Sequence, residues 1–272
     1  MTRLDEDACL RGEALWGDDF GGHELSAWYE AETSAYGDIW GDALAEQGYG
    51  YHALNARHGF AHLPPGRFQA ALAFGCADGE ELRPLAGRVD RVDAVEPDKR
   101  FHDRQLLGVE TLWHTPTLDG HLPFADASFD LVSVFGALHH VANVSTVLGE
   151  LRRCLAPGGH LLLREPVTSM GDWRRPRPGL TSNERGLPLG WLARTLAGLE
   201  VDVVHQALCL HGLTNLLARR LGRPVFANKA VVVADDLLCR LGAARLTYHA
   251  TSPLQKLRPT NVFLVLRARA GR

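Results

Sequence analysis

The sequence has no apolar run that approaches 18 residues, and its first residues are acidic rather than basic and then apolar. A membrane-spanning helix needs about 20 apolar residues, and a secretory signal starts with positive charge. The five cysteines are scattered and form no CxxC pair, so neither a disulfide framework nor a thiolate zinc site is indicated. We therefore expect a cytoplasmic protein with no membrane span and no metal.

The chain also lacks an excess of positive charge. Its formal net charge is −3, which gives no global attraction for polyanions, so we expect no nucleic-acid partner. The hydrophobic content of 46% and the charged content of 22% are typical of globular proteins. A length of 272 residues suits one large domain, or one domain with a smaller cap.

The pattern along the chain changes near residue 67. Residues 1–66 carry many aromatic side chains among short polar and glycine-rich stretches, and they end in a proline and glycine breaker, which predicts a helical N-terminal cap. Residues 67–272 alternate short apolar runs with amphipathic stretches, as βαβ units do, which predicts an α/β domain with a mainly parallel sheet. Within it, about 209–258 is expected to be a helical insertion.

Individual elements follow from the same patterns. Helices are expected at 97–108, between a proline start and a glycine stop, and at 145–155, 191–199, 213–221 and 230–241. Pro84 falls early in the helix expected after the first strand, so that helix should be short or displaced. Strands are expected at 70–74, 92–96, 109–113, 129–135, 160–164, 201–204 and 261–266.

A turn rich in small residues follows the first expected strand. It contains Gly75, Cys76, Ala77 and Gly79, and glycines there let the backbone approach a ligand closely. Glu96 ends the second strand some 20 residues on, where a carboxylate can accept both ribose hydroxyls of an adenosine. Either feature alone is also compatible with a plain tight turn or a solvated strand-end charge. Together they indicate an adenosine-containing ligand.

Five motifs occur in order between about residues 70 and 164. They are ALAFGCADG at 71–79, VEPD at 95–98, LPFADASFDL at 122–131, ALHHV at 137–141 and LAPGGHL at 155–161. This stretch resembles the methyltransferase family related to ubiquinone and menaquinone biosynthesis enzymes. The resemblance implies a Rossmann-like seven-stranded sheet with helices on both faces. It also implies S-adenosylmethionine as methyl donor, bound at the carboxyl ends of the first, second and fourth strands.

The resemblance also assigns cofactor-binding positions. The turn would face the methionine part, Glu96 with Pro97 the ribose, and Phe135 with Gly136 the far side of the cofactor. Two positions depart from the family pattern. Ala77 replaces the middle glycine, and the acidic residue expected to hold the adenine amino group is replaced by Leu118. Asp119, one position later, would serve after a loop shift, or adenine is held by backbone and apolar contacts alone.

Methyl transfer from a sulfonium is an in-line displacement, so the protein mainly aligns the acceptor and, for a hydroxyl, removes a proton. His139 and His140 follow the fourth strand and Glu165 ends the fifth, so all three are candidate bases at one sheet edge. The histidines could instead belong to the scaffold, and Glu165 could form an ion pair with Arg164.

Acceptor contacts are expected from Tyr49 and Tyr51 in the cap and from Arg174 in an arginine and proline-rich loop. Packing and a solvated loop are the alternative explanations. The acceptor would be a small molecule or saccharide, and the helical insertion would cover it or form a homodimer face. A catalytically inactive cofactor-binding or partner protein remains an alternative. A nicotinamide-dependent oxidoreductase predicts GxGxxG, whereas Glu80 follows Gly79 here.

Overall fold

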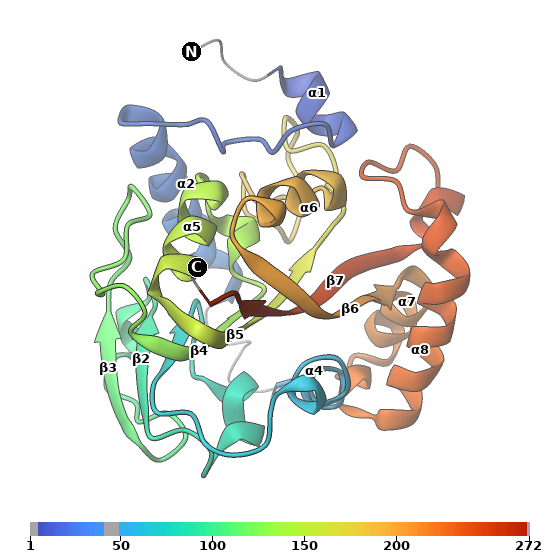
Figure 1. Ribbon diagram of the computed structural model, residues 1–272. Helices are drawn as coiled ribbons and strands as arrows, with labels where there is room; N and C mark the ends of the chain where they lie inside the picture. The colour runs from blue at the N-terminus through green and yellow to red at the C-terminus, as the bar shows by residue number, and fades with distance from the viewer. Residues whose placement is uncertain (1–4, 41–48, 271–272) are drawn as a thin grey trace.

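The computed structural model describes residues 5–40 and 49–270. Its centre is one seven-stranded sheet with the order β3-β2-β1-β4-β5-β7-β6 (Figure 1). The neighbours from β3 to β5 pair in parallel, whereas β7 is antiparallel to both β5 and β6. The Rossmann-like prediction is confirmed. The strands are β1 (Ala71–Phe74), β2 (Arg91–Val95), β3 (Glu110–His114), β4 (Phe129–Phe135), β5 (Leu155–Pro166), β6 (Val201–His211) and β7 (Pro259–Ala268).

Helices cover both faces of the sheet (Figure 1). One face carries α5 (Val144–Cys154) and α6 (Leu189–Ala197), whose apolar side chains recur at three-to-four spacing and are buried in one core cluster. The other face carries α4 (His52–His58) and α8 (Lys229–Gly242), with α7 (Gly212–Leu221) beside them. Burial of both sheet faces explains why the strand residues of β1 and β4 are almost all apolar.

The N-terminal helices divide between the two faces. α1 (Glu6–Arg11) and α2 (His23–Trp40) lie on the α5 side, where Trp28 packs against Ala142 after β4. α4 lies on the opposite side and packs Leu54 into the other core cluster. Among the described helices, none combines the length and the apolar character needed to cross a bilayer.

The connections differ from the predictions in two places. The helix expected at 97–108 is wrong, because the chain forms only a 3-10 turn at Lys99–Phe101. Side chains accept the hydrogen bonds of backbone N–H groups in this segment. Asp98 accepts from the Arg100 N–H, and Thr111 Oγ1 accepts from the Leu106 N–H. In addition, β6 runs to His211, into the segment expected to be helical. The helices expected at 213–221 and 230–241 are confirmed as α7 and α8.

The segment after β1 is short, as Pro84 predicts. It forms a 3-10 helix at Glu80–Leu85 rather than an α-helix, since proline lacks the N–H that a longer helix needs. Because β1, β2, β4 and β5 run in parallel, their carboxyl ends lie at one edge of the sheet. The connection from β1 to β2 contains only this short 3-10 helix. Ligands bind at such edges in open α/β sheets.

Candidate functional site

The turn after β1 is shaped by three residues with positive φ. These are Gly75 at +64°, Ala77 at +46° and Gly79 at +71°. A Cβ on Gly75 would clash with the Ala137 Cβ, so glycine is required where the turns after β1 and β4 meet. Ala77 adopts this left-handed backbone despite its side chain, which costs roughly 1–2 kcal/mol.

Glu96 connects the end of β2 to this turn. Its Oε2 accepts a hydrogen bond from the Ala77 N–H at 2.9 Å, and its Oε1 accepts one from the Asp98 N–H at 3.0 Å. The side chain is buried, and burial raises the pKa of Glu96 despite these two bonds. A buried carboxylate at a β2 end suits recognition of neutral hydroxyl groups, as expected for a ribose.

Glu81 adds a second buried carboxylate to this edge. Its Oε1 has no hydrogen-bond partner, and burial raises its pKa well above the usual value. The charged groups that act on it lie after β1, after β2 and at the end of β5, namely Asp78, Glu96, Arg164 and Glu165. An unpaired buried carboxylate here fits a cationic amino group, and the glycine turn supplies the close backbone approach. Both features fit the amino-acid end of the expected cofactor.

The other expected cofactor residues have varied surroundings. Gly136 follows β4 with φ +77°, and its N–H bonds to the Arg164 carbonyl oxygen at 2.8 Å. Phe135 is buried against Phe263. The Cys76 side chain is buried in the core, so only its backbone faces the turn, whereas Pro97 is exposed beside Glu96.

Asp119 is bonded within its own loop. Its Oδ1 accepts hydrogen bonds from the Thr117 hydroxyl at 2.6 Å and from the His121 N–H at 3.1 Å. The side chain is exposed, and the bond from Thr117 lowers the pKa of Asp119. The prediction that it holds adenine stays a prediction.

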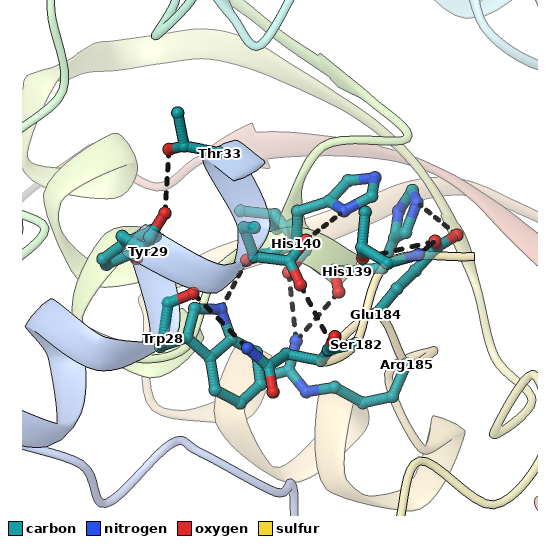
Figure 2. Close-up of polar contacts among 12 residues, drawn as sticks. Trp28, Tyr29, Thr33, His139, His140, Ser182, Glu184 and Arg185 are labelled. Atoms are coloured by element: carbon teal, nitrogen blue, oxygen red, sulfur yellow. Dashed lines mark hydrogen bonds and ion pairs between the residues drawn. The ribbon is translucent and has the colours of Figure 1, made fainter. Parts of the chain in front are cut away.

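The turn after β4 carries a buried network of histidines and glutamates (Figure 2). His139 Nδ1 lies 2.9 Å from Glu165 Oε2, and His140 Nδ1 lies 2.8 Å from Glu32 Oε2. The two imidazole centroids are 4.2 Å apart. Burial opposes protonation of His140, but the hydrogen bond to Glu32 and nearby carboxylates outweigh it and raise the pKa of His140.

Glu165 is fully buried and holds this turn in place. Its Oε1 accepts from the Ala137 and Leu138 N–H groups at 2.8 Å each, while its Oε2 meets His139. The structure thus brings the three candidate bases together. It also gives Glu165 three contacts within the turn.

Arg185 fixes the same turn from below (Figure 2). Its fully buried guanidinium donates to the carbonyl oxygens of His139 at 3.1 Å and Ala142 at 3.0 Å, and also to the Trp16 carbonyl at 2.9 Å. The Trp28 ring lies 4.8 Å from its guanidinium carbon. These contacts provide acceptors for the guanidinium N–H groups, which burial removes from water. Burial also lowers the pKa of Arg185.

The expected acceptor-binding tyrosines surround Arg164 on the opposite face. Tyr49 accepts a hydrogen bond from Arg164 Nη1 at 3.1 Å, and the Tyr51 ring lies 4.3 Å from the guanidinium carbon. Asn55 Oδ1 accepts a hydrogen bond from the same Arg164 Nη1 at 2.7 Å. Burial raises the pKa of Tyr49 to about 12. This cluster borders the edge at the end of β5.

Arg174 lies away from both clusters. Its guanidinium bonds to Asp7 at 2.6 Å and to Asp172 at 2.9 Å, which ties the arginine-rich loop to α1. Sequence reasoning missed Glu32, Glu184 and Arg185, which come from α2 and from the segment between β5 and α6. Only the fold reveals them, because no local spacing connects residues so far apart in sequence.

Comparison with known proteins agrees with this geometry. The family described as Methyltransferase domain matches residues 72–163. A Mycolicibacterium smegmatis protein assigned to the S-adenosylmethionine-dependent methyltransferases is 29% identical over 216 residues, covering 74% of this chain and 81% of its own. A ubiquinone/menaquinone biosynthesis C-methyltransferase of Hydrogenovibrio crunogenus is 28% identical over 139 residues, covering 47% and 53%. The first curated relatives are matched over about a third to a half of their length.

The fold agrees as well. The solved structure of the [4+2]-cyclase SpnF superposes with a TM-score of 0.53 at 16% identity, covering 91% of this chain and 96% of that one. Such an identity supports the fold alone. The ordered motifs, the sheet order and the matched family lead to one identification. The chain carries a class I S-adenosylmethionine-dependent methyltransferase domain, with S-adenosylmethionine as the cofactor that this domain implies.

Proposed function

We propose that the chain transfers the methyl group of S-adenosylmethionine to a small-molecule or saccharide acceptor in a cytoplasmic biosynthetic pathway. The observation that carries this proposal is the contact between Gly75 and Ala137, which brings the cofactor turn against the turn that presents His139 and His140. Proximity of donor and acceptor groups is the main requirement of an in-line methyl displacement.

The residues have separate roles in this proposal. Glu96 holds the ribose, and Glu81 meets the amino group of the methionine part. His139 and His140 face the acceptor and assist loss of its proton. Glu165 is a positioning residue, because its two oxygens hold Ala137, Leu138 and His139 rather than pointing to an open site.

The sheet order argues against the oxidoreductase alternative. Dinucleotide-binding sheets have the parallel order 3-2-1-4-5-6, whereas here the antiparallel β7 lies between β5 and β6. The turn after β1 also lacks the third small residue of that motif, since Glu80 follows Gly79.

A second candidate is a cofactor-binding protein that does not transfer methyl groups. Ala77 in a left-handed conformation and Asp119 bonded within its own loop favour it, since both depart from the family pattern. The solved [4+2]-cyclase of this fold is named for a different reaction. The two candidates differ in turnover and not in cofactor binding.

Calorimetry with S-adenosylmethionine and a methyl-transfer screen over saccharide and aromatic acceptors separate them. We expect saturable binding and turnover, with His140→Ala abolishing turnover at nearly unchanged cofactor affinity. Glu165→Ala should lower turnover by displacing His139. Saturable binding without turnover on any acceptor would favour the second candidate. Absence of binding in the folded chain would contradict both.

A homodimer is part of the proposal. The helices α7 and α8 expose large apolar side chains, and such side chains are normally covered in a stable assembly. They include Leu213, Leu217, Leu221, Val233, Leu237 and Leu241. Analytical ultracentrifugation should give twice the chain mass, and Leu237→Glu should give the monomer. A monomeric unaltered chain would contradict this.

A further inference from the structure

Two histidines and a glutamate converge beside the cofactor turn. A ring nitrogen of His139, a ring nitrogen of His140 and a carboxylate oxygen of Glu184 all lie within 4.8 Å of one another. Figure 2 shows His139 pointing toward Glu184 from the turn after β4. Glu184 is buried and comes from the segment that precedes α6.

The distance between His139 and Glu184 suits a bridging metal better than a direct bond. His139 Nε2 and Glu184 Oε1 are 3.6 Å apart, which is longer than the 2.7–3.2 Å of an ordinary N–H···O hydrogen bond. Two ligands bound at about 2.1 Å to a tetrahedral zinc ion are separated by about 3.4 Å. The pair is therefore already close to the spacing of two metal ligands.

The other nitrogen of each imidazole is bonded to a different carboxylate. Glu165 meets His139 Nδ1 and Glu32 meets His140 Nδ1. Metal-binding histidines almost always donate their second ring N–H to such an outer partner, which fixes the ring and makes Nε2 a better ligand. Both histidines show this arrangement.

Glu184 is oriented in the same way. Its Oε2 accepts the Thr181 N–H at 3.1 Å, so that Oε1 is the oxygen directed to His139. The carboxylates of Glu32, Glu165 and Glu184 are all buried. Arg185 and Arg177 bring positive charge near them, but both guanidinium groups donate to backbone carbonyls. A bound cation would offset the remaining negative charge.

We propose that His139, His140 and Glu184 bind a divalent first-row transition metal through Nε2, Nε2 and Oε1. Two imidazoles and one carboxylate suit such ions and leave a position open. The ligand separations, at most 4.8 Å, would contract by up to about 1.4 Å as the ion binds. The sequence predicted no metal because it lacks CxxC pairs, but that observation excludes only a site built from cysteine thiolates.

This site deepens the proposed function and rests on it for the acceptor class, with His139 and His140 assisting proton loss through the bound ion and not as bases. The open position would take the hydroxyl oxygen of the acceptor and favour its ionised form. The O–H bond then breaks and its proton passes to solvent. A bond forms from that oxygen to the methyl carbon, while the S–C bond breaks and the sulfonium becomes a thioether. The acceptor would therefore be an alcohol or phenol.

The test uses the full chain after treatment with a chelator. Titration with Zn²⁺ by calorimetry should give one ion per chain, and Co²⁺ should produce the visible absorption of a low-symmetry site. Glu184→Gln keeps an acceptor for Thr181 but removes the charged ligand. His140→Asn keeps a donor for Glu32 but removes Nε2. Each should weaken Zn²⁺ binding at least tenfold, with far-ultraviolet circular dichroism unchanged.

His62→Gln is the matched control, because His62 stacks on His205 at 3.6 Å, outside the cluster. It should bind Zn²⁺ as the unaltered chain does. No saturable binding, or equal weakening by the control, would overturn the metal site. Calorimetry with S-adenosylmethionine separates the two proposals. Metal binding without cofactor binding contradicts the proposed function alone, and cofactor binding without metal binding contradicts the site alone.

Discussion

The backbone N–H of Ala77 donates to Glu96 Oε2 at 2.9 Å, and this bond joins the turn after β1 to the end of β2. The same carboxylate also accepts from the Asp98 N–H. Glu96 thus organises the backbone that follows both strand ends. A change at Glu96 should affect the shape of the proposed cofactor site as well as its charge.

We expect Glu96→Gln to weaken S-adenosylmethionine binding by about 10- to 100-fold. A hydrogen bond to a charged group contributes about 1.5–3 kcal/mol, and 1.4 kcal/mol corresponds to tenfold in affinity. Isothermal calorimetry measures the change. Asp90→Asn is the control, because Asp90 precedes β2 at the opposite edge of the sheet and pairs with Arg67. Equal affinities for both variants would remove Glu96 from the cofactor site.

Gly75 and Ala77 allow a paired test of the turn. Gly75→Ala should lower the free energy of unfolding by about 3 kcal/mol, because it adds a clash with Ala137 to an unfavourable positive φ. Ala77→Gly relieves the positive φ but increases the entropy of the unfolded chain, so stability should change by less than about 1 kcal/mol. Urea denaturation measures both. A Gly75→Ala protein as stable as the unaltered chain would contradict the close approach of the two turns.

The sheet and the positive-φ turn after β1 could be predicted from the sequence because their signals are local. The glycine turn and Glu96 each lie directly after a strand end. The helix expected at 97–108 failed because Thr111 Oγ1 accepts the Leu106 N–H and Trp113 Nε1 donates to the Arg104 carbonyl oxygen, so these backbone groups are taken by side chains.

The histidine network could not be predicted in the same way. His139 and His140 stand out in the sequence, but Glu32, Glu184 and Arg185 reach them only through tertiary packing. Burial of these charged side chains is a property of the fold, and hydrophobic periodicity carries no information on it. The metal site is visible only once α2 and the segment before α6 are placed against β4.

Arg185→Lys should lower the free energy of unfolding by about 3 kcal/mol. The planar guanidinium reaches several carbonyl oxygens at once, whereas an ammonium group on a flexible stem cannot span them. Turnover should fall further than S-adenosylmethionine affinity, because the displaced turn carries His139. Chemical denaturation, calorimetry and methyl-transfer assays measure these three quantities. Arg219→Lys, on the exposed side of α7, should leave all three unchanged.

Glu150 should give the chain a defined sensitivity to acid. It bonds to Arg153 one turn along α5 and accepts the Leu122 N–H at 2.9 Å, so it fastens the loop before β4. The bond to Arg153 is the main reason why the pKa of Glu150 falls from 4.5 to about 2. His121 lies 3.7 Å away and acts in the same direction.

A carboxyl group whose pKa is lower in the folded state stabilises the protein above its unfolded pKa and loses this effect as the pH falls. Glu150→Gln should therefore cost about 2 kcal/mol at pH 7, as expected for charged hydrogen bonds. The difference from the unaltered chain should start to shrink below about pH 4.5 and continue to shrink toward pH 2. Urea denaturation between pH 7 and pH 3 measures it, with the exposed Glu110→Gln as control. A cost that is the same at pH 7 and pH 3 would show that the Glu150 charge does not hold this loop.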